Sequence, residues 1–332
     1  MKKVLILGGT NFIGRNLVEK FLELDEYEIT LFNRQVTHST LFPSVNRIKG
    51  DRESDDITKI SRTDWNYVID LSCYYPQALE RVLKSINKVD KYIFISTCSV
   101  YDIEANSSVM KDEESKILSC SISQLADRST DSYGNRKAEC ERILVNSGVP
   151  FIILRPALVF GKYDSTDRFY YWLFQVKKMD TILLPENGKR IFSTTYVHDL
   201  VDAIIRSLSQ SVSSEVFNVI TNPKTSIEQV VNIAGQTLRT EFSSAHASLS
   251  FLEKNQVNQW TDIPLWLKTD SFTFSNERVM HKLGMKPTEF EVSISETIRF
   301  YEKLDWPKPK SGFSESKLLD LIEELKTDES CS

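Results

Sequence analysis

The stretch Gly8-Gly9-Thr10-Asn11-Phe12-Ile13-Gly14 decides the fold of this 332-residue chain. It follows an apolar run from Val4 to Leu7 and precedes a segment from Arg15 to Leu24 that has the pattern of a helix. A buried strand, a glycine turn and a helix in this order place backbone N–H groups and a helix N-terminus where a pyrophosphate can bind. The sequence therefore predicts a dinucleotide site near its start.

A second motif, Tyr133-Gly-Asn-Arg-Lys137, lies far from the first in the sequence. On a helix, residues four positions apart lie one turn apart on the same face. An ammonium group there favours the ionised phenol, and an unperturbed tyrosine with a pKa of about 10 is a poor base near neutrality. We therefore expect Lys137 to lower the pKa of Tyr133. A dinucleotide site combined with such a phenol suggests hydride transfer.

Further stretches extend the pattern, and the resemblance that they carry spans most of the chain. They are Phe94-Ile-Ser-Thr-Cys-Ser-Val-Tyr101, Leu154-Arg-Pro-Ala-Leu-Val-Phe-Gly161, Thr195-Tyr-Val-His-Asp199 and Val216-Phe-Asn-Val219. With the first two motifs, the chain resembles the extended short-chain dehydrogenase/reductase family, also called the NAD-dependent epimerase/dehydratase family. Its glycine turn is similar to that of an atypical subgroup that includes the chloroplast stem-loop RNA-binding proteins.

Composition indicates a globular protein, and the resemblance implies a small-molecule substrate. The chain is 41% hydrophobic and 11% aromatic, and its formal charge of -5 offers no global basic field, so nucleic acid is an unlikely partner. The first apolar run is too short to span a membrane. The cysteines have an odd count and no metal-site spacing, which favours reduced thiols, no metal and a cytoplasmic protein. These cysteines are Cys73, Cys98, Cys120, Cys140 and Cys331.

Apolar runs alternate with helical patterns, which is typical of an α/β fold. We expect a Rossmann-type doubly wound parallel sheet with a smaller C-terminal substrate lobe. The predicted strands are Lys3 to Leu7, Glu28 to Asn33, Arg47 to Lys49, Tyr67 to Leu71, Tyr92 to Ser96 and Phe151 to Leu154. The predicted helices include Ile13 to Leu24, Pro76 to Asn87 and Ser132 to Asn146.

The domain organisation follows from the resemblance. Residues 1–160 are expected to form the NAD(P)-binding domain, to which 191–220 return, and 161–190 with 221–310 the substrate lobe. Residues 311–332 are expected to form a charged helical tail that either caps the molecule or frays. A homodimer that packs Arg81 to Asn87 and Ala138 to Val145 of each subunit is expected by analogy, with a monomer as the alternative.

The resemblance implies cofactor contacts along the carboxyl edge of the sheet. The residues are Gly8, Thr10, Asn11, Phe12, Ile13, Gly14, Asn33, Arg34, Asp51, Arg52, Leu71, Ser72, Cys73, Ser96, Tyr133, Lys137, Pro156, Ala157 and Val159. Asn11 replaces the usual middle glycine. Asparagine tolerates left-handed backbone conformations, so Asn11 either binds phosphate or is a tolerated turn residue.

The end of the second strand bears on the choice of cofactor. It reads Leu31-Phe32-Asn33-Arg34, without the carboxylate that binds the ribose hydroxyls of NAD. Because a guanidinium can bind a 2′-phosphate, NADP(H) is favoured over NAD(H), unless Arg34 is merely a solvated loop residue. Arg52 either reinforces this phosphate site or pairs with Asp51.

The resemblance assigns the chemistry to Thr97, Tyr133 and Lys137. Tyr133 would exchange a proton with a substrate hydroxyl or carbonyl, Lys137 would also hold the nicotinamide ribose, and Thr97 would bind the same substrate oxygen. Sugar 4,6-dehydratases of the family carry an acidic pair where this chain has Cys98 and Ser99, so dehydration is unlikely. Epimerase and reductase both remain open, on a sugar-like substrate.

Candidate substrate residues are Tyr74, Ser99, Arg168, Arg190 and His198. Tyr74 either lines the substrate mouth or packs, and each arginine either binds a substrate phosphate or carboxylate or is a surface charge. His198 is expected to be structural unless it lies near the substrate. The alternative for the whole chain is a non-catalytic cofactor-binding or RNA-binding member of the atypical subgroup.

Overall fold

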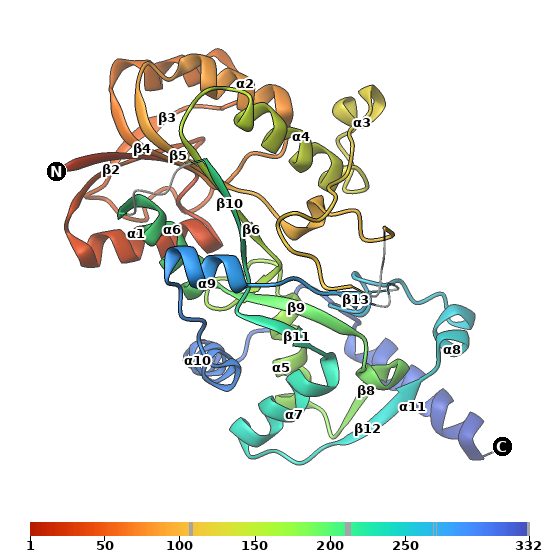
Figure 1. Ribbon diagram of the computed structural model, residues 1–332. Helices are drawn as coiled ribbons and strands as arrows, with labels where there is room; N and C mark the ends of the chain where they lie inside the picture. The colour runs from red at the N-terminus through yellow and green to blue at the C-terminus, as the bar shows by residue number, and fades with distance from the viewer. Residues whose placement is uncertain (106–108, 210–213, 268, 270, 331–332) are drawn as a thin grey trace.

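The computed structural model describes residues 1–105, 109–209, 214–267, 269 and 271–330. A seven-stranded parallel sheet forms one half of the molecule (Figure 1). In spatial order its strands are β10 (Glu215–Val219), β6 (Phe151–Pro156), β5 (Val89–Ile95), β4 (Trp65–Asp70), β1 (Lys2–Leu7), β2 (Tyr27–Asn33) and β3 (Asn46–Lys49). The chain runs outward in one direction from β1 to β3 and in the other from β4 to β10, so the strand order reverses between β1 and β4.

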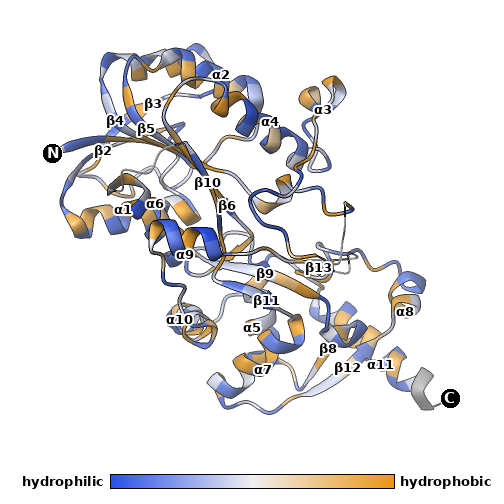
Figure 2. Ribbon diagram, in the orientation of Figure 1, coloured by the Kyte–Doolittle hydropathy of each residue, from blue (hydrophilic) through white to orange (hydrophobic). Residues whose placement is uncertain are grey.

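Helices cover both faces of this sheet. They are α1 (Phe12–Leu24) and α6 (Val197–Ser209) on one face, and α2 (Pro76–Ser85), α4 (Tyr133–Val145) and the short η1 (Asp55–Arg62) on the other. Val4 and Ile6 of β1 pack toward α1 and α6, whereas Leu5 and Leu7 pack toward α2 and α4. A strand buried on both faces needs an apolar run rather than an alternating pattern, as the sequence of β1 has. Figure 2 shows that the helices α1 and α2 each carry both polar and apolar residues.

The other half contains two smaller sheets. One joins β11 (Asn222–Thr225), β9 (Ile191–Tyr196) and β13 (Ser271–Phe272), with β7 (Leu158–Phe160) also pairing β9; the other joins β8 (Thr181–Pro185) and β12 (Ser243–Ala247). The remaining elements are η2 (Cys98–Val100), α3 (Ile122–Ala126), α5 (Arg168–Lys178), η3 (Glu186–Gly188), α7 (Ile227–Leu238), α8 (Leu249–Lys254), α9 (Glu277–Leu283), α10 (Phe290–Lys303) and α11 (Glu315–Ser330).

The predicted α/β doubly wound parallel sheet is confirmed, with different ends for some elements. β5 begins at Val89 rather than Tyr92, and α2 ends at Ser85 because Ile86 is extended, with φ -89° and ψ 121°. One prediction is wrong: Ile191–Tyr196 does not return to the large sheet but pairs with β7 and β11, while α6 and β10 do return. The division into a cofactor domain and a substrate lobe stays a prediction, since it assigns a role to each part.

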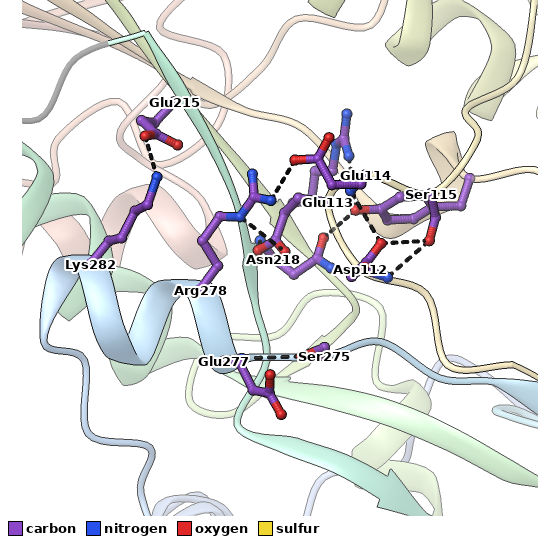
Figure 3. Close-up of polar contacts among 12 residues, drawn as sticks. Asp112, Glu113, Glu114, Ser115, Glu215, Asn218, Ser275, Glu277, Arg278 and Lys282 are labelled. Carbon is purple, nitrogen blue, oxygen red and sulfur yellow. Dashed lines mark hydrogen bonds and ion pairs between the residues drawn. The ribbon is translucent and has the colours of Figure 1, made fainter.

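Ion pairs hold α9 and the segment 112–115 against the edge strand β10 (Figure 3). Lys282 of α9 lies 2.5 Å from Glu215, and Arg278 lies 2.5 Å from Glu114 and 3.5 Å from Glu113. Glu113 also accepts a hydrogen bond of 2.8 Å from the backbone N–H of Asn218. Segments distant in sequence are thus fixed together at the edge of the sheet.

The tail packs onto the second half rather than fraying. Leu318, Leu321, Ile322 and Leu325 of α11 are buried in the same apolar cluster as α5 and α7. Side chains three and four positions apart share a helix face, which gives α11 one apolar stripe. Cys331 and the end of the predicted tail lie outside the described residues.

Candidate functional site

A cavity of about 310 Å³ lies at the carboxyl ends of the central strands, where the strand order reverses. Loops that follow β1, β2, β3 and β4 form its walls. Its lining includes Gly8, Thr10, Asn11, Asn33, Arg34, Asp51, Arg52, Ser72 and Tyr74. Ligands of open α/β sheets bind at such a switch point, so the fold brings this part of the predicted cofactor site together.

The glycine loop has conformations and contacts that require glycine. Gly8 and Gly9 have φ values of +118° and +98°, which side chains rarely adopt. A Cβ on Gly14 would lie 2.6 Å from the Cα of Gly9. Gly14 therefore permits the close packing of α1 on the loop, and it brings the helix N-terminus to the cavity.

Asn11 does not adopt a left-handed backbone conformation. Its φ of -124° and ψ of 157° are extended, so the reason that we expected for asparagine here does not apply. It precedes α1, yet its side chain makes no capping hydrogen bond to the first turn, and its Nδ2 lies 3.5 Å from Ser165 Oγ. A side chain that lines the cavity without capping leaves the first-turn N–H groups available to an anion.

Asn33 and Arg34 have different roles at the end of β2. Asn33 donates a hydrogen bond of 3.1 Å to the carbonyl of Gly8 and accepts one of 3.0 Å from the N–H of Gln35, so it fixes the loops. Arg34 is exposed, lines the cavity and has no hydrogen bond or ion pair within the described residues. Its guanidinium can therefore bind a ligand.

Arg52 pairs with Asp70, not with Asp51. Two hydrogen bonds of 2.6 and 2.8 Å join the guanidinium to the carboxylate, and the hydroxyl of Tyr92 donates another of 2.7 Å to Asp70. Burial alone would raise the pKa of Asp70, but the charge and hydrogen bonds of Arg52 outweigh it and lower that pKa. Most of the charge of Arg52 is thus balanced inside the protein, which weakens its predicted role at a phosphate.

The candidate catalytic hydroxyls lie near each other. Thr97 precedes η2, and its Oγ1 accepts a hydrogen bond of 3.1 Å from the N–H of Ser99 and donates one of 3.2 Å to Ser99 Oγ. Tyr133 begins α4. Burial raises the pKa of its phenol, and hydrogen bonding with Thr97 acts in the opposite direction. The two groups can therefore approach one substrate oxygen.

Sequence reasoning missed the role of Gly134. A Cβ on Gly134 would lie 2.2 Å from the carbonyl oxygen of Ser99. No side chain fits at that distance, so glycine lets the start of α4 lie directly against the segment after β5. This contact sets the position of Tyr133 relative to Thr97. The glycine stood inside the second motif and was the available signal.

Lys137 differs from expectation. Its Nζ donates to the carbonyl of Ile95 at 2.6 Å and of Cys73 at 3.0 Å, and it lies 4.0 Å from the centroid of the Phe94 ring. A buried ammonium must be satisfied, and these carbonyls satisfy it. The predicted lowering of the pKa of Tyr133 is therefore not found; that pKa is raised. An ammonium has three N–H donors, and these two contacts use two of them.

Ser96 belongs to a buried polar network that the sequence did not reveal. It donates a hydrogen bond to Glu141 of α4, which forms an ion pair with Arg155 of β6 at 2.5 Å. Arg155 donates to Tyr101 at 2.8 Å, and the Tyr101 hydroxyl donates to Asn218 at 2.6 Å. The network fixes α4 on the sheet. With its hydroxyl used here, Ser96 supports the site rather than offering a donor to the cofactor.

Arg168 places a cation near the phenol. It begins α5, and its guanidinium lies 4.5 Å from the centroid of the Trp260 ring. Burial lowers its pKa, while the charges of Asp164 and Tyr133 act in the opposite direction. Arg168 has no ion pair or hydrogen bond in the described part of the chain. Tyr74, half exposed, lies with its ring centroid 6.2 Å from that of Tyr133, so both Tyr74 and Arg168 adjoin the candidate site.

Two predicted substrate residues are not brought to this site. Arg190 forms hydrogen bonds of 2.6 and 2.7 Å with Glu186 and one of 3.1 Å with the carbonyl of Thr269, so its charge is balanced within the protein. His198, on α6, lines a separate groove beside α1 and lies 3.8 Å from Glu296. Both positions favour structural roles over contact with a substrate at Tyr133.

The remaining predicted cofactor residues are not among those that line this cavity. Phe12 and Ile13 pack partly into the core, and Leu71 donates its N–H to the carbonyl of Leu7 at 3.2 Å. The N–H of Ala157 is already bonded to Thr195 Oγ1 at 3.0 Å. Pro156 is the last residue of β6, and Val159 of β7 pairs with Thr195 of β9.

Two classes of site are not seen in the described residues. These residues contain neither a group of three or more His, Cys, Asp or Glu side chains placed to hold a metal ion nor a helix with the length and apolarity to cross a membrane. The polar groups that do converge are those at the carboxyl edge of the large sheet. A glycine loop, a helix N-terminus and a cavity at a switch point are the features that dinucleotide-binding α/β folds share.

The family is shown by comparison with known proteins. Residues 4–219 match the model of the NAD dependent epimerase/dehydratase family. The chain belongs to this family, as the resemblance predicted.

Three similar proteins illustrate its range. The chloroplast stem-loop binding protein of 41 kDa b of Arabidopsis thaliana is 26% identical over 234 residues, 66% of this chain and 58% of that protein. The UDP-glucose 4-epimerase of Thermotoga maritima, with UDP-glucose, has a TM-score of 0.71 at 19% identity over 91% of this chain and 99% of that one. The UDP-glucuronic acid 4-epimerase of Bacillus cereus, with NAD, has a TM-score of 0.71 at 16% identity over 92% and 98%. The match thus spans less than two thirds of the plant relative, and the likeness to the two epimerases shows the fold.

Proposed function

We propose that this protein is an NAD(P)-dependent hydride-transfer enzyme that epimerises or reduces a nucleotide-sugar-like hydroxyl or carbonyl substrate. The observation that carries the proposal is the proximity of Tyr133 to Thr97 and to Tyr74, which lines the glycine-loop cavity, with the charged Arg168 also near the phenol. Proteins of the same fold that bind UDP-glucose or NAD support this assignment.

The residues present fit a dinucleotide. Gly8 to Gly14 and the N-terminus of α1 would hold the pyrophosphate, and the third N–H of Lys137 would hold a ribose hydroxyl. When bound, the nicotinamide would supply or accept the hydride. Tyr133 would exchange the proton of the reacting oxygen, and Thr97 would orient that oxygen.

The fine specificity follows from charge. Arg34 is exposed and unpaired among the described residues, so we assign it to a 2′-phosphate and favour NADP(H) over NAD(H). Arg168 is assigned to an anionic substrate group such as a diphosphate. Cys98 and Ser99, neither of them an acid, follow Thr97, which supports epimerisation or reduction over 4,6-dehydration.

A second candidate is a cofactor-binding member without turnover, or one that binds RNA. The raised pKa of Tyr133, the engagement of Lys137 by carbonyls and the similarity to a stem-loop binding protein favour it. A gel shift with stem-loop RNA, weakened by salt, would support RNA binding, since phosphate contacts dominate such affinity. The net charge of -5 argues against this candidate.

Mass spectrometry of cofactor that copurifies with the protein, followed by titration with NADP(H) and NAD(H), tests the proposal. Exchangeable NADPH supports a reductase, and tightly held NAD supports an epimerase and contradicts the role given to Arg34. Binding of neither favours the second candidate. The homodimer through α2 and α4 and the cytoplasmic location stay predictions, checked by light scattering and by cell fractionation.

A further inference from the structure

Two buried thiols lie close together near Lys137 of the candidate site. The Sγ atoms of Cys73 and Cys140 lie 4.0 Å apart, although 67 residues separate them in sequence. The thiol of Cys73, which follows β4, is 1% exposed, and that of Cys140, on α4, is 0% exposed. No disulfide joins them, and Cys73, Cys98, Cys120 and Cys140 are all free thiols.

The surroundings favour chemistry at Cys73. Burial raises the pKa of its thiol, but the hydrogen bond with Cys140 and the positive charge of Arg52 lower it further than burial raises it. The same contact raises the pKa of Cys140, and the Cys73 thiol also lies 3.5 Å from the carbonyl of Tyr75, to which it can donate. A thiolate is the nucleophile in disulfide chemistry, so the two cysteines differ as an attacking and a resolving thiol do.

We propose that Cys73 and Cys140 form a reversible disulfide when the protein meets a hydroperoxide. The Cys73 thiolate attacks the peroxide, the O–O bond breaks, and a sulfenic acid forms with loss of water or alcohol. The Cys140 sulfur then attacks that sulfur, and the S–O bond breaks to release water. Two thiols are oxidised by two electrons, the peroxide is reduced, and both thiol protons leave in the products.

Closing the bond would displace the site. A disulfide has an S–S length of about 2.05 Å, so the sulfurs must approach by roughly 2 Å. The carbonyl of Cys73 binds Lys137, and its neighbours Ser72 and Tyr74 line the cavity. The disulfide is therefore expected to move the cavity wall at Ser72 and Tyr74 and to move the Cys73 carbonyl that binds Lys137. This consequence rests on the proposed cofactor function, whereas disulfide formation itself does not.

Oxidation of the full chain with hydrogen peroxide tests both steps. Peptide mass spectrometry is expected to find Cys73 linked to Cys140, and fluorescence titration is expected to give a dissociation constant for NADPH at least threefold higher, restored by dithiothreitol. Cys140→Ser is expected to remove both effects, whereas Cys120→Ser, at a partly exposed thiol, is expected to keep them. Circular dichroism melting verifies that each variant is folded.

Each other outcome contradicts a defined step. Oxidation confined to Cys120, or a disulfide that involves a cysteine other than Cys73 and Cys140, overturns the proposed disulfide. A Cys73–Cys140 linkage that leaves the dissociation constant unchanged overturns the effect on the site. If the reduced protein binds neither cofactor, the proposed function fails, and the linkage measurement still decides the disulfide.

Discussion

Arg52, which lines the switch-point cavity, and Asp70 form a two-point ion pair with hydrogen bonds of 2.6 and 2.8 Å. The pair fixes the loop after β3 to the end of β4. Because its charges balance, the cavity presents a different guanidinium, that of Arg34, to a bound anion. The ion pair therefore supports the fold, and the exposed arginine bears on the choice of cofactor.

Arg34→Ala is expected to weaken NADPH binding about 10-fold or more and to leave NADH binding within about twofold, since a hydrogen bond to a charged group contributes about 1.5–3 kcal/mol. Fluorescence titration with each cofactor measures the effect. Arg62→Ala, which removes an exposed arginine outside the cavity lining, is the control. Equal loss for both cofactors would contradict a 2′-phosphate contact.

Asp70→Asn is expected to lower the free energy of unfolding by about 3–5 kcal/mol, because it leaves Arg52 buried without its counter-ion. Asp202→Asn, which breaks the more exposed pair with Arg206, is expected to cost less than about 1 kcal/mol. Urea unfolding at neutral pH compares them. Similar losses in the two variants would contradict the importance of burial.

The same aspartate predicts a pH dependence. The pKa of Asp70 in the folded protein lies below its ordinary value of about 3.9. Its stabilising contribution is therefore complete above that ordinary value and is lost as the pH falls through the lower folded value. The stability advantage of the wild type over Asp70→Asn should shrink on acidification below pH of about 4. If the stability advantage of the wild type instead grew on acidification, the pKa of Asp70 would have to be raised in the folded protein, which would contradict this account.

Gly134→Ala is expected to reduce turnover at least 10-fold, because the new Cβ would force α4 away from Ser99 and displace Tyr133 from Thr97. Overpacking of this kind costs about 1–3 kcal/mol, so the melting temperature should also fall. Gly148→Ala is the control, since nothing lies within 4 Å of a Cβ there, although its φ of +75° adds some strain. Normal turnover of Gly134→Ala would exclude a positioning role for this contact.

Arg168→Ala is expected to raise the KM for a UDP-sugar about 10-fold while the affinity for the cofactor changes less than twofold, since a charge-assisted hydrogen bond is lost. Arg168→Lys is expected to recover part of the loss, because it keeps the charge but not the two-point geometry. Steady-state kinetics with an uncharged sugar provides the comparison. A matching loss with that sugar would argue against an anion contact.

Local patterns allowed the fold to be predicted. The apolar run before Gly8 specifies β1, and the glycines specify a turn that side chains cannot adopt, so neither depends on distant residues. The assignment of β9 failed because a short strand of β-branched, aromatic and hydroxyl residues fits either sheet. Its partners β7, β11 and β13 place it in a smaller sheet, and strand pairing does not follow from the sequence of one strand.

Less of the candidate site could be predicted from the sequence, because its contacts also join residues that are far apart in the chain. Arg52 could be placed near phosphate by its position, but its partner Asp70 lies 18 residues away, and Cys73, which binds Lys137, lies 64 residues from it. Such pairings depend on tertiary packing and not on residue type. The sequence identified the polar groups of the site; it could not tell which of them the protein itself satisfies.

Turnover by the wild type and by Tyr133→Phe, measured side by side with cofactor and a panel of UDP-sugars, tests the hydride-transfer proposal most directly. We expect the wild type to convert at least one sugar, as seen by mass spectrometry or NMR of the products. Tyr133→Phe should be slower by about 10²–10⁴-fold, because it lacks the acid–base group, and should bind the cofactor as tightly as the wild type. Equal turnover by the two proteins would contradict the role of Tyr133, and no turnover of any sugar by a cofactor-loaded wild type would contradict the proposed substrate class.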